Sequence, residues 1–336
     1  MEICYLIAFP DSAEKHAPPE QFTTLKDAPY FKPVDIDLVT LGEETVVIEG
    51  YAVTVSRQRY DGQVQMVECH YDLEDPFDPA LLKVRMKIQN ALQSRFVPEV
   101  NRVNGMYEEY SILLVQTAKP SPDKWVEKNA VSLATFIRSQ RETLDSMEIE
   151  ELLGARVHYS SHEMTVVDWE GAIIIAPNAD YQSDIALIKI GNYQLLRYRM
   201  LDQSIAEMLD KIRETFFGNQ KRVRATRGII SQIAQHKLEI MLDFERAEQS
   251  LLLIGDWYTA DLYEAIHEQF YLKDWKESVK TKLDNLENIM QTIKDNLSIS
   301  WEHLMDQIQL ILWMIMLFGY LYLYLLDAGW IKLQPR

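Results

Sequence analysis

Two histidines and a glutamate at close spacing form the first group of residues that could do chemistry. His158 and His162 flank the pair Ser160-Ser161, and Glu163 follows directly. Imidazole and carboxylate groups are common ligands of divalent transition metals. Residues four apart share a face of an uninterrupted strand, but a pair of serines is typical of a turn. The sequence therefore favours ordinary turn residues here, with a metal site as the alternative.

Four acidic residues between an expected strand and an expected helix form the second group. Asp72, Glu74, Asp75 and Asp78 lack the glycine and the distal glutamate of an EF-hand calcium loop. Asp78 directly precedes Pro79, and this order is typical of a helix cap followed by a first-turn proline. We expect a solvated loop that ends in a helix cap.

A short basic segment runs against the overall charge of the chain. The 34 Lys and Arg face 51 Asp and Glu, a formal charge of -17, which argues against a general nucleic-acid coat. Lys221, Arg222, Arg224 and Arg227 could still contact phosphates on RNA or lipid headgroups. A solvated linker that pairs with the acidic surface is the favoured interpretation.

Six aromatic residues are concentrated around the start of an expected helix. Their density favours a local core, and a surface that binds a protein partner is the alternative. They are Trp257, Tyr258, Tyr263, Phe270, Tyr271 and Trp275.

No residue pattern assigns a reaction. The sequence lacks GxxxxGK[ST], GxGxxG, HExxH and GxSxG motifs, so we assign no catalytic residue, no cofactor and no metal, and an enzyme is not favoured. Cys4 and Cys69 lie far apart without CxxC spacing. We expect both to be core residues in a reducing compartment.

An uncharged stretch near the C-terminus predicts a single transmembrane helix over residues 308–329. Leu310 to Leu326 carries no charge and would span about 25 Å as a helix, enough to cross a bilayer core. Interfacial aromatic residues favour the same interpretation. The residues expected to anchor this helix are Leu310, Trp313, Phe318, Tyr320, Leu326 and Trp330. We expect a single-pass protein with its N-terminal body in the cytosol or an equivalent interior compartment.

The elements before this helix predict an α+β fold with an antiparallel or mixed sheet. Strand-like runs begin at Ile3 and recur to Thr117, with one expected strand over Thr45 to Ser56, and Asp61-Gly62 predicts a hairpin. Apolar residues at helical spacing predict helices over Pro79 to Phe96 and from Asp123 to about Gln140. The expected divisions are an α+β domain over 1–155, a strand pair and long helix over 156–227, and a helical stalk over 228–307.

The stalk region has the apolar spacing of coiled coils. One seam passes through Ile240 and Phe244, and a second through Leu283, Leu286 and Ile293. A short break near Gly255 predicts a long antiparallel helical hairpin. Packing on the globular body and an oligomeric coiled coil are equally compatible with these seams.

The C-terminal half resembles the uncharacterised family named after the yeast proteins required for meiotic nuclear division. The resemblance rests on the strand pair over 166–175, the long helix from Tyr181, the pattern from Trp257 to Tyr263, the run over 282–286 and the terminal apolar span. It covers about 156–326. The family, which includes a mitochondrial inner-membrane relative, implies a membrane-anchored organiser that self-associates, and it implies no catalytic residues.

Together these patterns favour a membrane-tethered, non-enzymatic scaffold that self-associates and binds an unknown protein partner. The alternative is a membrane-bound effector or enzyme that senses or acts on a nucleotide or RNA through the basic segment. Nucleic acid is thus a conceivable partner that the charge balance does not favour.

Overall fold

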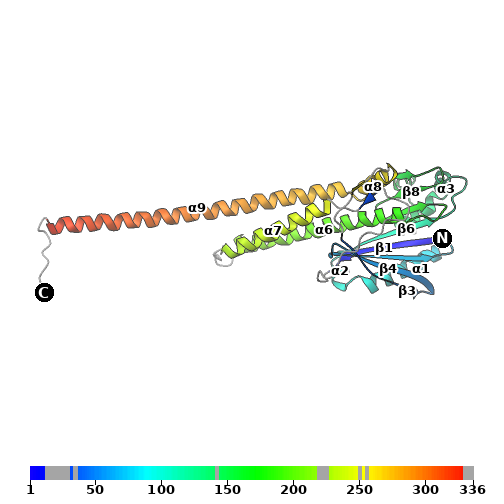
Figure 1. Cartoon of the computed structure of the whole chain (residues 1–336), viewed down its shortest axis with the longest axis horizontal. Helices are drawn as coiled ribbons and strands as arrows, with labels where there is room; N and C mark the ends of the chain where they lie inside the picture. Colours follow the sequence, from blue (N-terminus) through cyan, green and yellow to red (C-terminus); the bar gives the residue numbers. More distant parts are fainter. Residues whose placement is uncertain are drawn as a thin grey trace. The chain divides into compact units, whose positions relative to one another are not determined.

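The computed structural model describes most of the chain (Figure 1). It divides into two compact units, Met1–Lys280 and Thr281–Arg336. We call the described part of the first unit the head. The described residues are 1–11, 31–32, 37–140, 144–217, 227–248, 252–253 and 257–327.

An eight-stranded mixed sheet forms the centre of the head. Strand β1 (Glu2–Pro10) pairs antiparallel with β5 (Val64–Asp72) on one side and with β6 (Glu108–Val115) on the other. The strand order is β3-β4-β5-β1-β6-β9-β8-β7, and β6 pairs with β9 in parallel. The remaining strands of this sheet are β3 (Leu38–Ile48), β4 (Tyr51–Tyr60), β7 (Arg156–His158), β8 (Met164–Val167) and β9 (Gly171–Ile175). The predicted α+β class with a mixed sheet is confirmed.

The centre of the sheet is buried on both faces, which explains the continuous apolar sequence of β1. Successive side chains of a strand point to opposite faces. Tyr5 and Ile7 therefore join the larger core, which also contains Ile88 of a covering helix. Ala8 points to the other face and packs in a second core with Tyr193. A strand buried on both faces has no polar alternation.

The helix predicted over Pro79 to Phe96 is confirmed as α1 (Pro79–Phe96), and so is its cap. The Asp78 carboxylate accepts a hydrogen bond from the Ala80 amide at 2.8 Å. The helix predicted from Asp123 to Gln140 is instead divided at Asn129 into α3 (Pro122–Lys128) and α4 (Ala130–Arg138). Two shorter helices, α2 (Glu99–Val103) and α5 (Ser146–Leu152), complete this part of the head.

The expected strand from Thr45 to Ser56 is also divided, by a turn between β3 and β4. Glu49 and Gly50 have φ values of 51° and 87°, a left-handed conformation that suits a tight reversal. The hairpin predicted at Asp61-Gly62 is confirmed between β4 and β5, where both residues again have positive φ.

A long helix covers the second face of the sheet. Helix α6 (Gln182–Phe217) runs without a break through Gly191. A Cβ atom there would lie 2.4 Å from the Ile266 side chain of α8 (Trp257–Gln269), so glycine allows the two helices to pack closely. Helix α7 (Arg227–Glu248) packs antiparallel against α6 (Figure 1), with the Tyr198 and Phe244 rings 6.3 Å apart. The seam residue Phe244 thus meets α6 of the same chain.

The strands after residue 155 belong to the same sheet as those before it, since β9 pairs with β6. The expected boundary at 155 therefore falls inside one sheet. A two-stranded pair, β2 (Phe31–Lys32) with β10 (Leu252–Leu253), lies outside it.

The last helix, α9 (Leu272–Asp327), contains the apolar segment that the sequence predicts to cross a membrane. Met305–Leu325 has a mean hydropathy of 1.9 over its most apolar stretch, none of which is buried. One described helix is therefore long and apolar enough to span a bilayer.

Candidate functional site

A cleft of about 650 Å³ opens in the head beside the start of β6 and reaches from α1, on one face of the sheet, to α6, on the other. Its sides come from α1, residues 105–111, the end of α4, the turn between β8 and β9, two residues of α6, and Phe270, which follows α8. This volume is in the usual range of small-molecule sites. Six separate stretches of sequence meet here, so the cleft exists only in the folded head.

Polar side chains join α1 to the sheet along one side of the cleft. Gln89 donates to the Ser111 hydroxyl at 2.9 Å. One turn further along α1, Gln93 donates to the Tyr5 hydroxyl at 2.9 Å, and Tyr5 donates in turn to Glu109 at 2.5 Å. Burial and the nearby Glu109 carboxylate raise the pKa of Tyr5, so its hydroxyl remains a donor. These bonds fix the polar side chains before any ligand enters.

Aromatic rings form the opposite side. Phe270 lies 5.2 Å from Tyr110 and 6.4 Å from Trp169 between ring centroids. The Tyr110 hydroxyl donates to the Asp168 carbonyl at 2.7 Å, which fixes the ring. Trp169 is 39% exposed and borders both the cleft and the solvent. A planar apolar group could pack against these rings.

Two of the carboxylates that line the cleft are already paired with arginines. Arg138 lies 3.3 Å from Asp168 and 3.6 Å from Glu170. Arg199 pairs with Glu108. Burial raises the pKa of Glu108 and of Glu170, and in each case the arginine opposes this shift.

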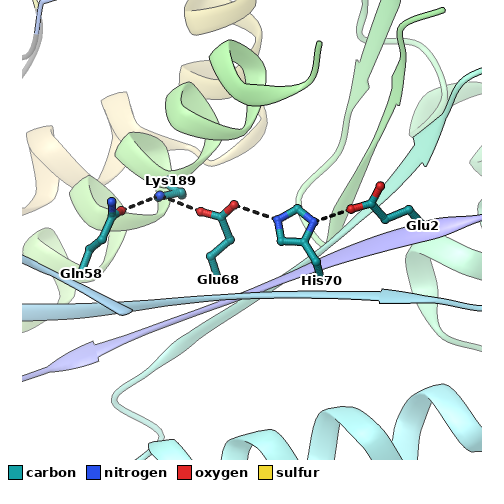
Figure 2. Close-up of polar contacts among 5 residues, drawn as sticks. All are labelled: Glu2, Gln58, Glu68, His70 and Lys189. Atoms are coloured by element: carbon teal, nitrogen blue, oxygen red, sulfur yellow. Dashed lines mark hydrogen bonds and ion pairs between the residues drawn. The ribbon is translucent and has the colours of Figure 1, made fainter. Parts of the chain in front are cut away.

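A second polar cluster lies on one face of the sheet, beneath α6. Figure 2 shows its side chains in a row, with the His70 ring between the carboxylates of Glu2 and Glu68. His70 contacts Glu2 through Nδ1 at 2.7 Å and Glu68 through Nε2 at 2.8 Å. Lys189 of α6 donates to Glu68 at 2.8 Å and to Gln58 at 2.6 Å. We call this row the ion-pair chain.

In the ion-pair chain, the effect of the neighbouring charges and hydrogen bonds on each pKa is larger than the effect of burial. Burial alone would raise the pKa of Glu68, but the Lys189 ammonium and His70 lower it to about 2. Burial alone would lower the pKa of His70, but hydrogen bonds to Cys4 and Glu68 raise it to about 11. The pKa of Lys189 is likewise raised by its neighbours Tyr60 and Glu68 against the effect of burial. At neutral pH two cations therefore face two carboxylates.

Cys4, Glu68 and His70 could in principle hold a metal ion, because one ligand atom from each lies within 4.8 Å of the others. Both Glu68 oxygens, however, already accept hydrogen bonds, one from His70 and one from Lys189. A metal ion would have to displace the imidazole proton beside the Lys189 ammonium. We interpret the cluster as an ion-pair network that attaches α6 to the sheet.

The Cys4 thiol in this cluster is not a reactive one. Its side chain is fully buried, and burial raises its pKa to about 11 although His70 and Lys189 act in the opposite direction. The thiolate is the nucleophilic form of cysteine. The prediction that Cys4 and Cys69 are core residues is confirmed, since both are buried and free.

Comparison with known proteins assigns the head to a family. A family profile described as "Uncharacterized protein MJ0711, N-terminal domain" matches residues 6–182, more than half of the chain. The chain belongs to this family. The uncharacterized protein MJ0711 of Methanocaldococcus jannaschii is 25% identical over 180 residues, which are 53% of this chain and 55% of the relative. The chain thus spans about half the length of the curated relative that it matches. No solved structure matches.

The MJ0711 N-terminal domain match includes most of the cleft and reaches only the first residues of α6. It covers Glu68 and His70 but ends before Lys189. The resemblance to the meiotic nuclear division family stays a prediction, because the match describes an uncharacterised domain.

In this member of the MJ0711 N-terminal domain family, the six aromatic residues differ in burial and form three pairs. Tyr258 and Phe270 are buried, and the Tyr258 hydroxyl donates to Asp184 at 2.7 Å. Trp257 and Tyr271 are 61% and 57% exposed. Tyr263 and Trp275 are half-buried. Two of the six residues thus belong to a local core, and a partner-binding role for the exposed ones stays a prediction.

The other predicted residues lie apart from the cleft or outside the described part of the chain. His158 contacts Asp123 at 3.1 Å, and His162 is exposed in the turn before β8. Lys221, Arg222 and Arg224 lie outside the described residues, and Arg227 begins α7. Binding of RNA or nucleotide by this segment stays a prediction.

The predicted membrane anchors lie on α9. Leu310, Trp313, Phe318 and Tyr320 are 58% to 72% exposed. Leu326 also belongs to α9, whereas Trp330 lies outside the described residues.

Sequence reasoning missed both the cleft and the ion-pair chain. Glu68 and His70 have the alternate spacing of a strand face, which was a usable signal. Their contacts with Glu2 and Cys4 depend on the pairing of β1 with β5, where Cys4 lies opposite His70. No short motif records that register.

Proposed function

We propose that this protein is a membrane-tethered, non-enzymatic scaffold whose head binds a protein partner. The observation that carries the proposal is the apolar segment Met305–Leu325, whose side chains have no cover within the described chain. Ten or more exposed apolar residues in sequence are unfavourable in water and favourable in a bilayer.

The chemistry of the head supports a binding role over a catalytic one. Of the side chains that act as nucleophiles and bases in enzymes, the described lining of the cleft contains glutamate, serine and tyrosine but no histidine, cysteine or lysine. Two of its three glutamates are paired with arginines. The histidine and the lysine of the ion-pair chain lie beneath α6 and are held in pairs with carboxylates.

Exposed aromatic side chains support a protein partner. Trp169 and Tyr271 lie 5.7 Å apart between ring centroids and are both exposed, and Trp257 is exposed on α8. Tryptophan and tyrosine are enriched at the centres of protein interfaces. We assign the partner surface to these three residues.

Self-association is part of the proposal and has its own support. Helix α7 buries Ile240 but leaves Leu238 56% and Leu242 46% exposed. These two residues lie one turn apart on the same side of the helix. A second copy of α7 would cover them.

Membrane attachment is tested by alkaline carbonate extraction of native membranes. The full chain should remain in the membrane pellet, and a chain that ends at Leu297 should be released. Release of the full chain would contradict membrane insertion.

Partner binding is tested by crosslinking and mass spectrometry on the full chain in native membranes. The pair of substitutions Trp257→Ala and Tyr271→Ala should remove a reproducible set of crosslinked proteins. Met147→Ala, at a residue that is 79% exposed on α5, is the matched control. An unchanged crosslinking pattern in the double variant would reject this surface.

Self-association is tested by blue-native electrophoresis of the detergent-extracted protein. Leu238→Glu and Leu242→Glu should convert oligomers to monomers. A wild-type protein that already migrates as a monomer would contradict this part of the proposal.

A further inference from the structure

Arg85 is a fully buried cation behind the cleft wall, and it is not itself one of the residues that line the cleft. Its side chain has no exposed area. It lies on α1 one turn before Gln89, which lines the cleft. The hydroxyl of Ser139, another lining residue, accepts a hydrogen bond from Arg85 Nη2. The guanidinium therefore lies directly behind two residues of the cleft.

Only one nitrogen of the Arg85 guanidinium is used. Nη2 donates to the Phe136 carbonyl at 2.8 Å and to Ser139, at the end of α4. This contact explains part of the burial, because a cation is favourable at a helix C-terminus. The Phe136 ring packs against the guanidinium at 4.1 Å. The Nε and Nη1 atoms have no hydrogen-bond partner within the described structure.

No carboxylate among the described residues lies within ion-pair distance of Arg85. Burial lowers the pKa of Arg85, and Tyr71, Tyr5 and, least of the three, the Glu109 carboxylate oppose this effect. Glu109 already accepts hydrogen bonds from Tyr5 and Gln93. An unpaired buried charge is strongly unfavourable, and native proteins rarely contain one without a partner or ordered water.

We propose that the cleft binds a small organic anion, whose carboxylate or other oxyanion head pairs with the Arg85 guanidinium. A ligand oxyanion that displaces the Ser139 hydroxyl from Nη2 can accept from Nη1 and Nη2 together, which is a preferred bidentate geometry of arginine with such groups. The body of the ligand packs against Tyr110, Trp169 and Phe270.

The charges around the cleft limit the ligand to a low negative charge. Glu108 and Glu170 are each paired with an arginine, Arg199 and Arg138. Glu109 remains near the cleft as a carboxylate without an arginine, and it would repel a polyphosphate. A single oxyanion on a ring-sized body fits both this charge balance and the volume of about 650 Å³.

The test compares three probes of the same shape and different charge. Benzoate, benzyl alcohol and benzylamine are titrated against the full chain in detergent micelles, at constant ionic strength, by ligand-observed saturation-transfer NMR. Benzoate should bind most tightly of the three. Tightest binding of benzylamine, or no binding of benzoate, would overturn the proposal.

Variants then locate the bound anion. Arg85→Met should weaken benzoate binding about tenfold or more, the effect of losing a charged hydrogen bond. Arg95→Met is the matched control on the same helix, because Arg95 is exposed and pairs with Glu44 away from the cleft lining. It should change benzoate binding less than about twofold.

A second variant protects the test against misfolding of Arg85→Met. Gln89→Glu preserves the shape of the side chain, lets the Ser111 hydroxyl donate where it now accepts, and places a carboxylate one helical turn from Arg85. That carboxylate should pair with the guanidinium and exclude benzoate. If the folded Gln89→Glu protein binds benzoate as tightly as the wild type, the anion does not use Arg85 and the proposal is wrong.

Discussion

Buried charge is treated in opposite ways on the two faces of the central sheet. Beneath α6, Lys189 and His70 each contact a carboxylate, and Figure 2 shows these side chains in one continuous row. Behind the cleft, the guanidinium of Arg85 contacts a carbonyl, a hydroxyl and a ring but no described carboxylate. The first cluster is complete within the chain, whereas the second has donors left to use.

This difference separates a structural cluster from a binding site. Removing one member of a buried ion pair leaves the other charge without a partner, which is strongly destabilising. Removing a buried cation that has no carboxylate partner leaves no opposite charge behind. Substitutions on the two faces should therefore differ in their effect on stability.

Lys189→Met should give the largest loss of stability. It leaves the Glu68 carboxylate without its ammonium partner in a buried position, and we expect the free energy of unfolding to fall by about 3–5 kcal/mol. Urea unfolding of the full chain in micelles, followed by tryptophan fluorescence, measures it. Lys87→Met is the matched control, since Lys87 and Glu49 form an exposed pair, and should cost less than about 1 kcal/mol. Equal effects would show that the ion-pair chain contributes no more than a surface pair.

Asp184→Asn tests a buried carboxyl group that has hydrogen bonds but no cation partner among the described residues. Burial raises the pKa of Asp184 to about 6, although Thr165 and Tyr258 donate to it and act in the opposite direction, while Asp180 and Glu163 add to the rise. The folded pKa exceeds the ordinary value, so stability is highest at low pH and falls as the pH rises through about 6.

The amide of Asp184→Asn does not ionise, so the variant should not lose stability as the pH rises. At pH 7.5 we expect the variant to exceed the wild type in free energy of unfolding by up to about 3 kcal/mol. The difference should disappear at pH 4. Urea unfolding at both values measures it, and a variant that is less stable than the wild type at pH 7.5 would contradict the expectation.

The regular elements of the fold could be predicted because their signals are local. The helical spacing of the apolar residues and the cap at Asp78 lie in one short segment that ends at Phe96, and both predictions are confirmed. The hairpin at Asp61-Gly62 and the apolar segment of α9 are equally local. The divided strand at Glu49 was missed because a non-glycine residue with positive φ carries a weaker signal than Asp-Gly.

The clusters of polar residues could not be predicted, because they depend on contacts between distant segments. Cys4 lies opposite His70 only after β1 pairs with β5 in one register, and a shift by one residue would reverse every side chain. Arg85 appears in the sequence as one more cation on an amphipathic helix. Its burial follows from the packing of α1 against the end of α4.

The substitution His70→Gln tests how the stability that the ion-pair chain contributes depends on pH. His70 faces Glu2 and Glu68 with Cys4 beside it, and its contacts raise its pKa to about 11. A folded pKa above the ordinary value of 6.5 gives stability that is complete below pH 6.5 and is lost as the pH rises towards 11. Between pH 7 and pH 9 the wild type should lose about 2 kcal/mol more than the variant. Parallel stability curves would show that His70 is neutral in the folded protein.

Arg85→Met should give the smallest change, less than about 1 kcal/mol in the absence of an added anion, because the lost contacts with Phe136 and Ser139 are offset by the relief of an unpaired charge. Arg197→Met is the matched comparison, since Arg197 is also buried but lies 3.6 Å from Asp243. Urea unfolding should rank Arg197→Met as clearly more destabilising. If Arg85→Met instead costs as much as Lys189→Met, the guanidinium is a structural charge like the others, and the two faces of the sheet do not differ as proposed.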